Sequence, residues 1–203
     1  MYELTKPHIR GGIKIKFIKN VSDDLANYLS INTKLDNTMY REQISYALQA
    51  IIGEALRLGI LLILFASFGK LHYFVFSFVL LASLRVFAGG YHADSFLKCL
   101  LFSTTFFTIA IFGTQLFEKT IVNNSFILLL ISTLLIGYKA PITSKFRPIK
   151  SKKRYIMLKI LAVVTTLLWI LALMIWIKDS IYVSVGVLTI FLESVQLFLK
   201  RRV

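Results

Sequence analysis

Apolar residues occur along most of the chain in long runs that are separated by short polar links. The runs have about the 17 to 25 residues that an α-helix needs to cross a bilayer. They occupy residues 46–68, 72–88, 97–117, 124–140, 156–177 and 181–199. Two links, Gly69-Lys70 and Lys178–Ser180, are short enough to be tight turns between antiparallel helices. The pattern predicts an all-α, polytopic membrane protein with about six transmembrane helices.

The first 45 residues differ, because they contain no uninterrupted apolar run, and no cleavable signal peptide is expected. The Ser22-Asp23-Asp24 segment is a candidate N-cap for a short helix. One side of that helix would carry Val21, Leu25, Tyr28 and Leu29. We therefore predict that residues 1–45 form a cytoplasmic, interfacial amphipathic segment, with a flexible basic tail as the alternative. Residues 46–203 would form the six-helix transmembrane domain.

Composition agrees with a membrane protein and excludes two other classes. Of the 203 residues, 57% are hydrophobic and 17% charged, and mean hydropathy is +0.72. A soluble domain needs a larger polar surface, and a disordered chain has fewer apolar residues. The net charge of +14 would suggest nucleic-acid binding on a soluble domain. Beside long apolar runs it indicates loops facing anionic membrane lipids, so no nucleic-acid partner is expected.

The distribution of Lys and Arg predicts the orientation. If the N-terminus is inside, the cytoplasmic side carries seven in residues 1–45, seven in 139–155 and three in 200–202. The opposite side carries three, namely Lys70, Lys119 and Lys178. This positive-inside bias predicts a multi-pass protein of the plasma membrane with cytoplasmic N- and C-termini.

Several polar side chains interrupt the predicted spans, all in their cytoplasmic halves: Glu54, Arg57, Arg85, Glu193 and Gln196. Charged groups within a membrane are costly and usually functional. Glu54 and Arg57 have the spacing of a simple helix ion pair, so a structural role is an equal alternative. A non-enzymatic small transporter or channel subunit, with these residues along a path, is the alternative function.

The link between the second and third spans contains the residues that are the strongest candidates for catalysis. It holds Cys99, the only cysteine, and His92. A thiolate nucleophile needs a base and electropositive surroundings, which His92 and a helix N-terminus would supply. A buried structural cysteine and a solvated histidine are the alternatives. The three histidines and one cysteine lack the spacing of metal ligands, so neither a metal nor a cofactor is expected.

Helix geometry requires the chain to bend between the two residues. In one continuous helix, His92 and Cys99 would lie about 10 Å apart along the axis, too far for proton transfer. The Gly89-Gly90 pair can end the second helix and permit a positive φ. Asp94 or Ser95 is a plausible N-cap for the third helix. Cys99 would then lie one turn into that helix.

The run RVFAGGYHADSFLKC resembles the signature of the accessory gene regulator B (AgrB) family of Gram-positive bacteria. These are membrane-embedded cysteine endopeptidases that mature quorum-sensing peptides. The signature has an Arg, then Gly-Gly-x-His, then a Cys seven residues after the His; its positions here are Arg85, Gly89, Gly90, His92 and Cys99. Residues 138–141, with the basic residues and Pro148 that follow, resemble a second family element.

The resemblance implies that 46–203 is a peptidase domain with His92 and Cys99 as catalytic residues. Arg85, Gly89, Gly90 and Asp94 would support the site, although no residue is evident as a third catalytic member. The implied substrate is a small amphipathic AgrD-like precursor peptide. Its C-terminal part would be cleaved through a thioester on Cys99, giving a cyclic thiolactone or lactone. Family analogy also suggests a homodimer.

A basic segment after the fourth span is a candidate docking site for the acidic tail of such a precursor. Its candidate substrate-binding residues are Lys145, Arg147, Lys150, Lys152 and Lys153, followed by Arg154. Ordinary positive-inside retention with contact to membrane lipids is the alternative, with equal weight.

Overall fold

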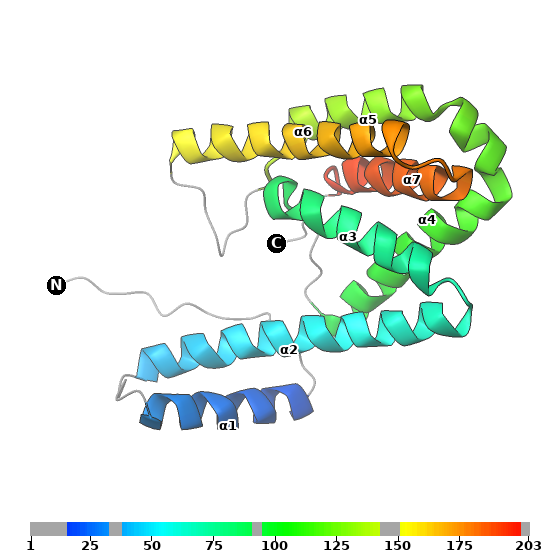
Figure 1. The fold of residues 1–203 in the computed structure, drawn as a ribbon. Helices are drawn as coiled ribbons and strands as arrows, with labels where there is room; N and C mark the ends of the chain where they lie inside the picture. The colour runs from blue at the N-terminus through cyan, green and yellow to red at the C-terminus, as the bar shows by residue number, and fades with distance from the viewer. Residues whose placement is uncertain (1–15, 33–37, 91–94, 143–150, 200–203) are drawn as a thin grey trace. The chain divides into compact units, whose positions relative to one another are not determined.

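The computed structural model describes residues 16–32, 38–90, 95–142 and 151–199. Within them it contains seven helices and no strand (Figure 1). The helices are α1 (Lys16–Asn32), α2 (Thr38–Ser67), α3 (Leu71–Ala88), α4 (Phe96–Asn123), α5 (Ser125–Lys139), α6 (Lys152–Ile175) and α7 (Ser180–Gln196). The predicted all-α, polytopic fold class is confirmed, since α2 to α7 correspond one by one to the six apolar runs.

Four of these helices are long and apolar enough to cross a membrane: α3, α4, α6 and the part of α2 from Ile44 to Ser67. The helices α5 and α7 are apolar but have only 15 and 17 residues. With a rise of 1.5 Å per residue they reach about 22 and 26 Å, less than the roughly 30 Å of a bilayer core. Four of the six predicted spans are therefore helices of sufficient length, and the other two, α5 and α7, are short.

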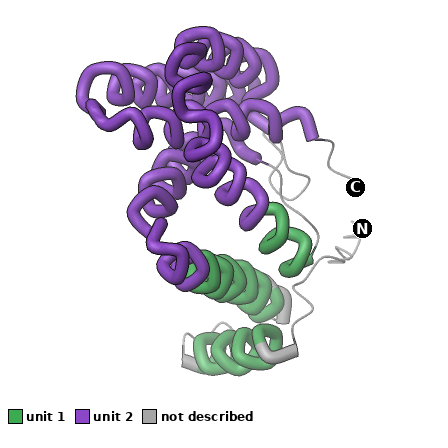
Figure 2. The backbone as a smooth tube through the Cα atoms, turned by 90° about the vertical axis from the view of Figure 1, so that its right-hand side faces the viewer, with its two compact units in different colours: residues 1–61, 93–102 green, residues 62–92, 103–203 purple. Residues whose placement is uncertain are grey.

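The chain divides into two compact units (Figure 2). Unit 1 contains residues 1–61 and 93–102, and unit 2 contains residues 62–92 and 103–203. Unit 1 thus holds α1, most of α2 and the first turns of α4. The boundary predicted between residues 45 and 46 falls inside α2. The separation of an interfacial segment from a transmembrane domain stays a prediction.

In unit 1, α1 lies beside the beginning of α2 (Figures 1 and 2). Its residues Ile18, Ser22 and Ala26, spaced four apart, are buried. The predicted apolar side is also present and is exposed, with Val21, Leu25, Tyr28 and Leu29 on it. A surface of this kind suits the bilayer interface.

The predicted N-cap of α1 is wrong. The helix begins at Lys16, so Ser22, Asp23 and Asp24 lie in its interior. Asp23 accepts a hydrogen bond from the Ser45 hydroxyl of α2, and the side chain of Ser22 is buried. The polar cluster therefore serves helix packing in place of capping.

In unit 2, the helices α3, α5, α6 and α7 pack together, and α7 contacts the other three. Its Gly186 lets α6 approach closely, because a Cβ atom there would lie 2.5 Å from a Leu173 methyl group. Buried polar groups also link these helices. Ser77 of α3 and Thr189 of α7 share a hydrogen bond of 2.7 Å. The Trp169 indole of α6 donates to Ser83 at 2.7 Å. Small residues and interhelical hydrogen bonds are typical contacts of helices in membranes.

The ends of these helices follow ordinary capping rules. Gly69, with φ of 65°, follows α2, and the Lys70 N–H donates to the Phe65 carbonyl at 2.8 Å. The Asp179 side chain caps α7 by accepting from the Ile181 N–H at 2.8 Å. Both predicted tight turns are confirmed. The helix α4 is interrupted at Phe117, where φ is −125° and ψ is 21°, and its predicted span ended at this residue.

Candidate functional site

The first turn of α4 places Cys99 as predicted. Ser95 precedes the helix, and its hydroxyl accepts a hydrogen bond from the Lys98 N–H at 3.3 Å. The Ser95 carbonyl accepts from the Cys99 N–H at 3.0 Å. These contacts make Ser95 the N-cap residue. They confirm that Cys99 lies one turn into the helix, where the peptide dipoles favour negative charge.

Cys99 is buried on a face of α4 that also carries Phe96. The exposed fraction of Cys99 is 6% and that of Phe96 is 7%. Residues three apart lie on one side of a helix, so this face of α4 points into unit 1. The Arg57 guanidinium of α2 lies over the Phe96 ring, 5.8 Å from its centroid. The helical turn that carries Cys99 therefore contacts the Arg57 guanidinium through Phe96.

The ion pair predicted between Glu54 and Arg57 is confirmed, with 2.7 Å between Arg57 Nη1 and Glu54 Oε2. The sequence did not reveal that the same guanidinium reaches Phe96. An aromatic residue directly after a helix cap was the available signal. Because Glu54 pairs with Arg57, it partly neutralises the positive charge that Arg57 places near the start of α4.

The end of α3 is a sharp turn that only glycine accommodates. Gly89 has a φ of 77°, and its N–H donates to the Arg85 carbonyl at 3.0 Å. A Cβ atom on Gly89 would lie 3.1 Å from the Ile142 carbonyl oxygen. The Ile142 N–H in turn donates to the Ala88 carbonyl at 3.0 Å. The predicted helix end at Gly89 is confirmed, and the turn is fixed against the segment that follows α5.

Arg85 links this turn to α7. Its Nε lies 3.4 Å from Glu193 Oε2, and its Nη2 donates to Gln196 Oε1 at 2.6 Å. Arg85 is thus paired with Glu193, whereas Glu54 is paired with Arg57. The backbone of Gly90 lies against the same guanidinium, because a Cβ there would be 3.0 Å from Arg85 Nε. We call Arg85, Glu193 and Gln196 the Arg85 cluster.

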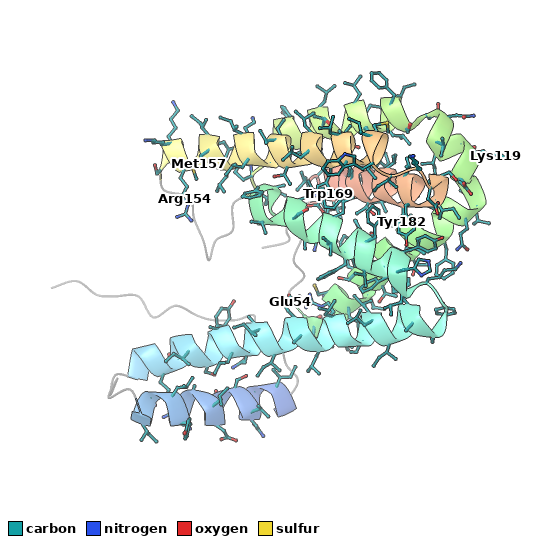
Figure 3. All side chains as sticks on the ribbon, in the orientation of Figure 1. Glu54, Lys119, Arg154, Met157, Trp169 and Tyr182 are labelled. Carbon is teal, nitrogen blue, oxygen red and sulfur yellow. The ribbon has the colours of Figure 1, made fainter. Side chains whose placement is uncertain are left out.

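The remaining predicted site residues are distributed as follows. His92, Asp94, Lys145, Arg147 and Lys150 lie outside the described residues. Lys152 and Lys153 form, with Arg154, the exposed first turn of α6 (Figure 3). The structure brings Arg85, Gly89 and Gly90 together in unit 2, and Cys99 belongs to unit 1. The described residues contain no group of three or more His, Cys, Asp or Glu side chains arranged to hold a metal ion.

Fold and sequence together define a polytopic helical membrane protein with a Gly-Gly-x-His…Cys segment between two spans. The family model of accessory gene regulator B (AgrB) matches residues 22–197, so the chain belongs to this family. A putative AgrB-like protein of Clostridium beijerinckii is 27% identical over 130 residues. That match covers 64% of this chain and 65% of the relative's length. No solved structure matches the chain.

Proposed function

We propose that this AgrB-family protein is an integral membrane cysteine endopeptidase with Cys99 as nucleophile and His92 as base. Family membership supports processing of a peptide signal in general. The observation that carries the specific proposal is the position of Cys99. It lies one turn into α4, and Ser95 is the N-cap of that helix. In the same turn, the Phe96 ring packs against the Arg57 guanidinium. A helix N-terminus is a common location of nucleophilic cysteines in proteins.

In the proposed reaction, His92 takes the proton of the Cys99 thiol, and the thiolate attacks the scissile carbonyl of the precursor. Backbone N–H groups at the start of α4 stabilise the oxyanion. The scissile C–N bond then breaks, and the leaving amine takes the proton from His92. The C-terminal fragment departs, and the remaining peptide stays on Cys99 as a thioester.

A Cys or Ser side chain of the peptide then attacks this thioester. Its proton passes to His92 and on to the Cys99 sulfur, so a thiolactone or lactone forms and the enzyme is regenerated. Exchange of one thioester for another changes the free energy little. Ring closure therefore competes with hydrolysis only where water is excluded and the internal nucleophile is held close. The burial of Cys99, whose exposed fraction is 6%, suits this requirement.

We propose further that the substrate is a small amphipathic AgrD-like precursor whose acidic tail binds the basic segment before and within α6. The exposed first turn of α6 carries Lys152, Lys153 and Arg154 and no acidic residue. Cations at a helix N-terminus oppose the helix dipole, so they weaken this helix slightly. An anionic partner, either the precursor tail or lipid headgroups, offsets that effect.

The test is cleavage of a precursor peptide by the purified full chain in proteoliposomes. We expect Cys99→Ala and His92→Ala to abolish cleavage, and Cys99→Ser to retain at most a trace of activity because an alcohol is a weaker nucleophile. Wild-type cleavage by Cys99→Ala would reject the proposal. The transporter alternative is not favoured, because Arg57 and Arg85 are each paired with a carboxylate. It predicts flux that is insensitive to thiol alkylation.

A further inference from the structure

The Arg85 cluster places a charged group where it is costly. The side chain of Glu193 is fully buried and that of Gln196 almost so. Among the described residues, Glu193 Oε1 and Gln196 Nε2 have no hydrogen-bond partner. A buried carboxylate is stabilising only with excellent geometry and all its acceptors satisfied, whereas the Arg85 contact is 3.4 Å long. A contribution to stability therefore does not explain this arrangement.

Other contacts already hold α3 against its neighbours. The Ser77–Thr189 hydrogen bond joins α3 to α7, and the Trp169–Ser83 hydrogen bond joins α3 to α6. The Arg85 cluster is thus not needed to attach α3 to the bundle. It lies instead at the C-terminal end of α3, beside the turn formed by Gly89 and Gly90.

The guanidinium of Arg85 touches the turn itself. Gly90 has no side chain, and the space that a Cβ atom would occupy is 3.0 Å from Arg85 Nε and 3.4 Å from Arg85 Cζ. Any shift of the guanidinium would release the Gly90 backbone on one side. Gly89 is held on the other side by Ile142. Two residues after Gly90 comes His92.

We infer that Glu193 and Gln196 of α7 are positioning residues. They hold Arg85 against the turn at Gly89 and Gly90, and through this turn they determine the position of His92. This inference rests on the proposed function, in which His92 is the base. Neither residue touches the substrate in this scheme, so their loss acts on the chemical step and leaves precursor binding in place.

The test uses the full chain in proteoliposomes with two measurements. The first is kcat and KM for precursor cleavage. The second is the rate of alkylation by a small maleimide as a function of pH, which reports on Cys99 alone because it is the only cysteine. A neighbouring protonated imidazole stabilises the thiolate, so loss of His92 from its place raises the pH midpoint of alkylation.

The variants are Glu193→Gln, Glu193→Asp and Gln196→Met, with His92→Ala as reference. We expect Glu193→Gln and Gln196→Met to lower kcat about 10- to 100-fold, as for a misplaced catalytic group, with KM within about threefold. The pH midpoint should rise towards that of His92→Ala. Removal of a negative charge alone would move it down, so the sign separates the two causes. Glu193→Asp should recover part of kcat.

Thr189→Val is the matched control, because it removes another buried hydrogen bond between the same two helices. It should lower thermal stability and leave the pH midpoint unchanged. The inference is overturned if Thr189→Val reproduces the kcat loss and the midpoint shift. It is also overturned if Glu193→Gln and Gln196→Met both behave as the wild type. If Glu193→Gln does not fold, Gln196→Met decides alone, since it leaves the ion pair intact. If His92→Ala changes neither measurement, the proposed function fails first and the inference with it.

Discussion

Single glycines in unit 2 define where its helices and turns come close. Gly89 and Gly90 allow the turn after α3, as described above. Gly186 acts between helices, because its α-carbon faces the fully buried side chain of Leu173. Closely packed interiors respond to even one added methyl group. Residue-scale predictions therefore follow from the available space alone.

We expect Gly186→Ala to destabilise unit 2 by about 1–3 kcal/mol, the usual cost of overpacking. The added Cβ would lie 2.5 Å from one Leu173 methyl group and 3.0 Å from the other, so Leu173 must move within a filled core. Thermal unfolding in detergent would measure the effect. Gly137→Ala is the control, because its Cβ would meet only Val163 at 3.6 Å. Equal melting temperatures for the two variants would contradict the overpacking.

At this scale, local features were predictable from the sequence and pairings were not. The glycine turn at Gly89 and the cap at Ser95 depend on adjacent residues, and both are observed. The choice of Glu193 for Arg85 is different, because the two are 108 positions apart and meet only when α3 and α7 pack. The contact of Arg57 with Phe96 has the same origin.

Helix ends were predictable to within a few residues where an apolar run stops. The interruption of α4 at Phe117 coincides with the end of the predicted span. The predicted N-cap of α1 was wrong for a physical reason, because Ser and Asp side chains can bind other helices instead of capping their own. Here Ser45 donates to Asp23 from another helix.

The first turn of α6 provides a prediction for a whole element. Replacement of Lys152, Lys153 and Arg154 by Gln should raise KM for an acidic precursor at least about threefold, since each of the three exposed charge contacts is worth about 0.2–1 kcal/mol. The helix itself should be no less stable, because cations at its N-terminus oppose the dipole. Steady-state cleavage at low and high salt measures this effect, and salt should reduce the difference.

Lys178→Gln serves as the control for this loss of charge, because Lys178 is predicted on the opposite side of the membrane. It should leave KM unchanged. If the triple variant also retains the wild-type KM, the basic turn does not bind the precursor, and contact with lipid headgroups is its role.

For the whole molecule, the number of membrane-spanning helices depends on whether the two short helices, α5 and α7, cross the bilayer. A helix of 15 residues, such as α5, falls about 8 Å short of the bilayer core. Local thinning accommodates such mismatch at fractions of a kcal/mol per Å. If α5 did not cross, the segment 139–155, with its seven basic residues, would lie on the same side as Lys119. That placement would violate the positive-inside rule, so we expect α5 to cross.

Single cysteines in a Cys99→Ser background test this topology in intact cells. Lys119→Cys and Lys178→Cys should react with a membrane-impermeant maleimide added outside, because both exposed positions lie at predicted outer ends. Lys152→Cys, exposed at the start of α6, should react only after permeabilisation. Labelling of Lys152→Cys in intact cells would mean that α5 returns without crossing. The basic turn of α6 would then be unable to meet a cytoplasmic precursor, and its proposed docking role would fail with the six-span topology.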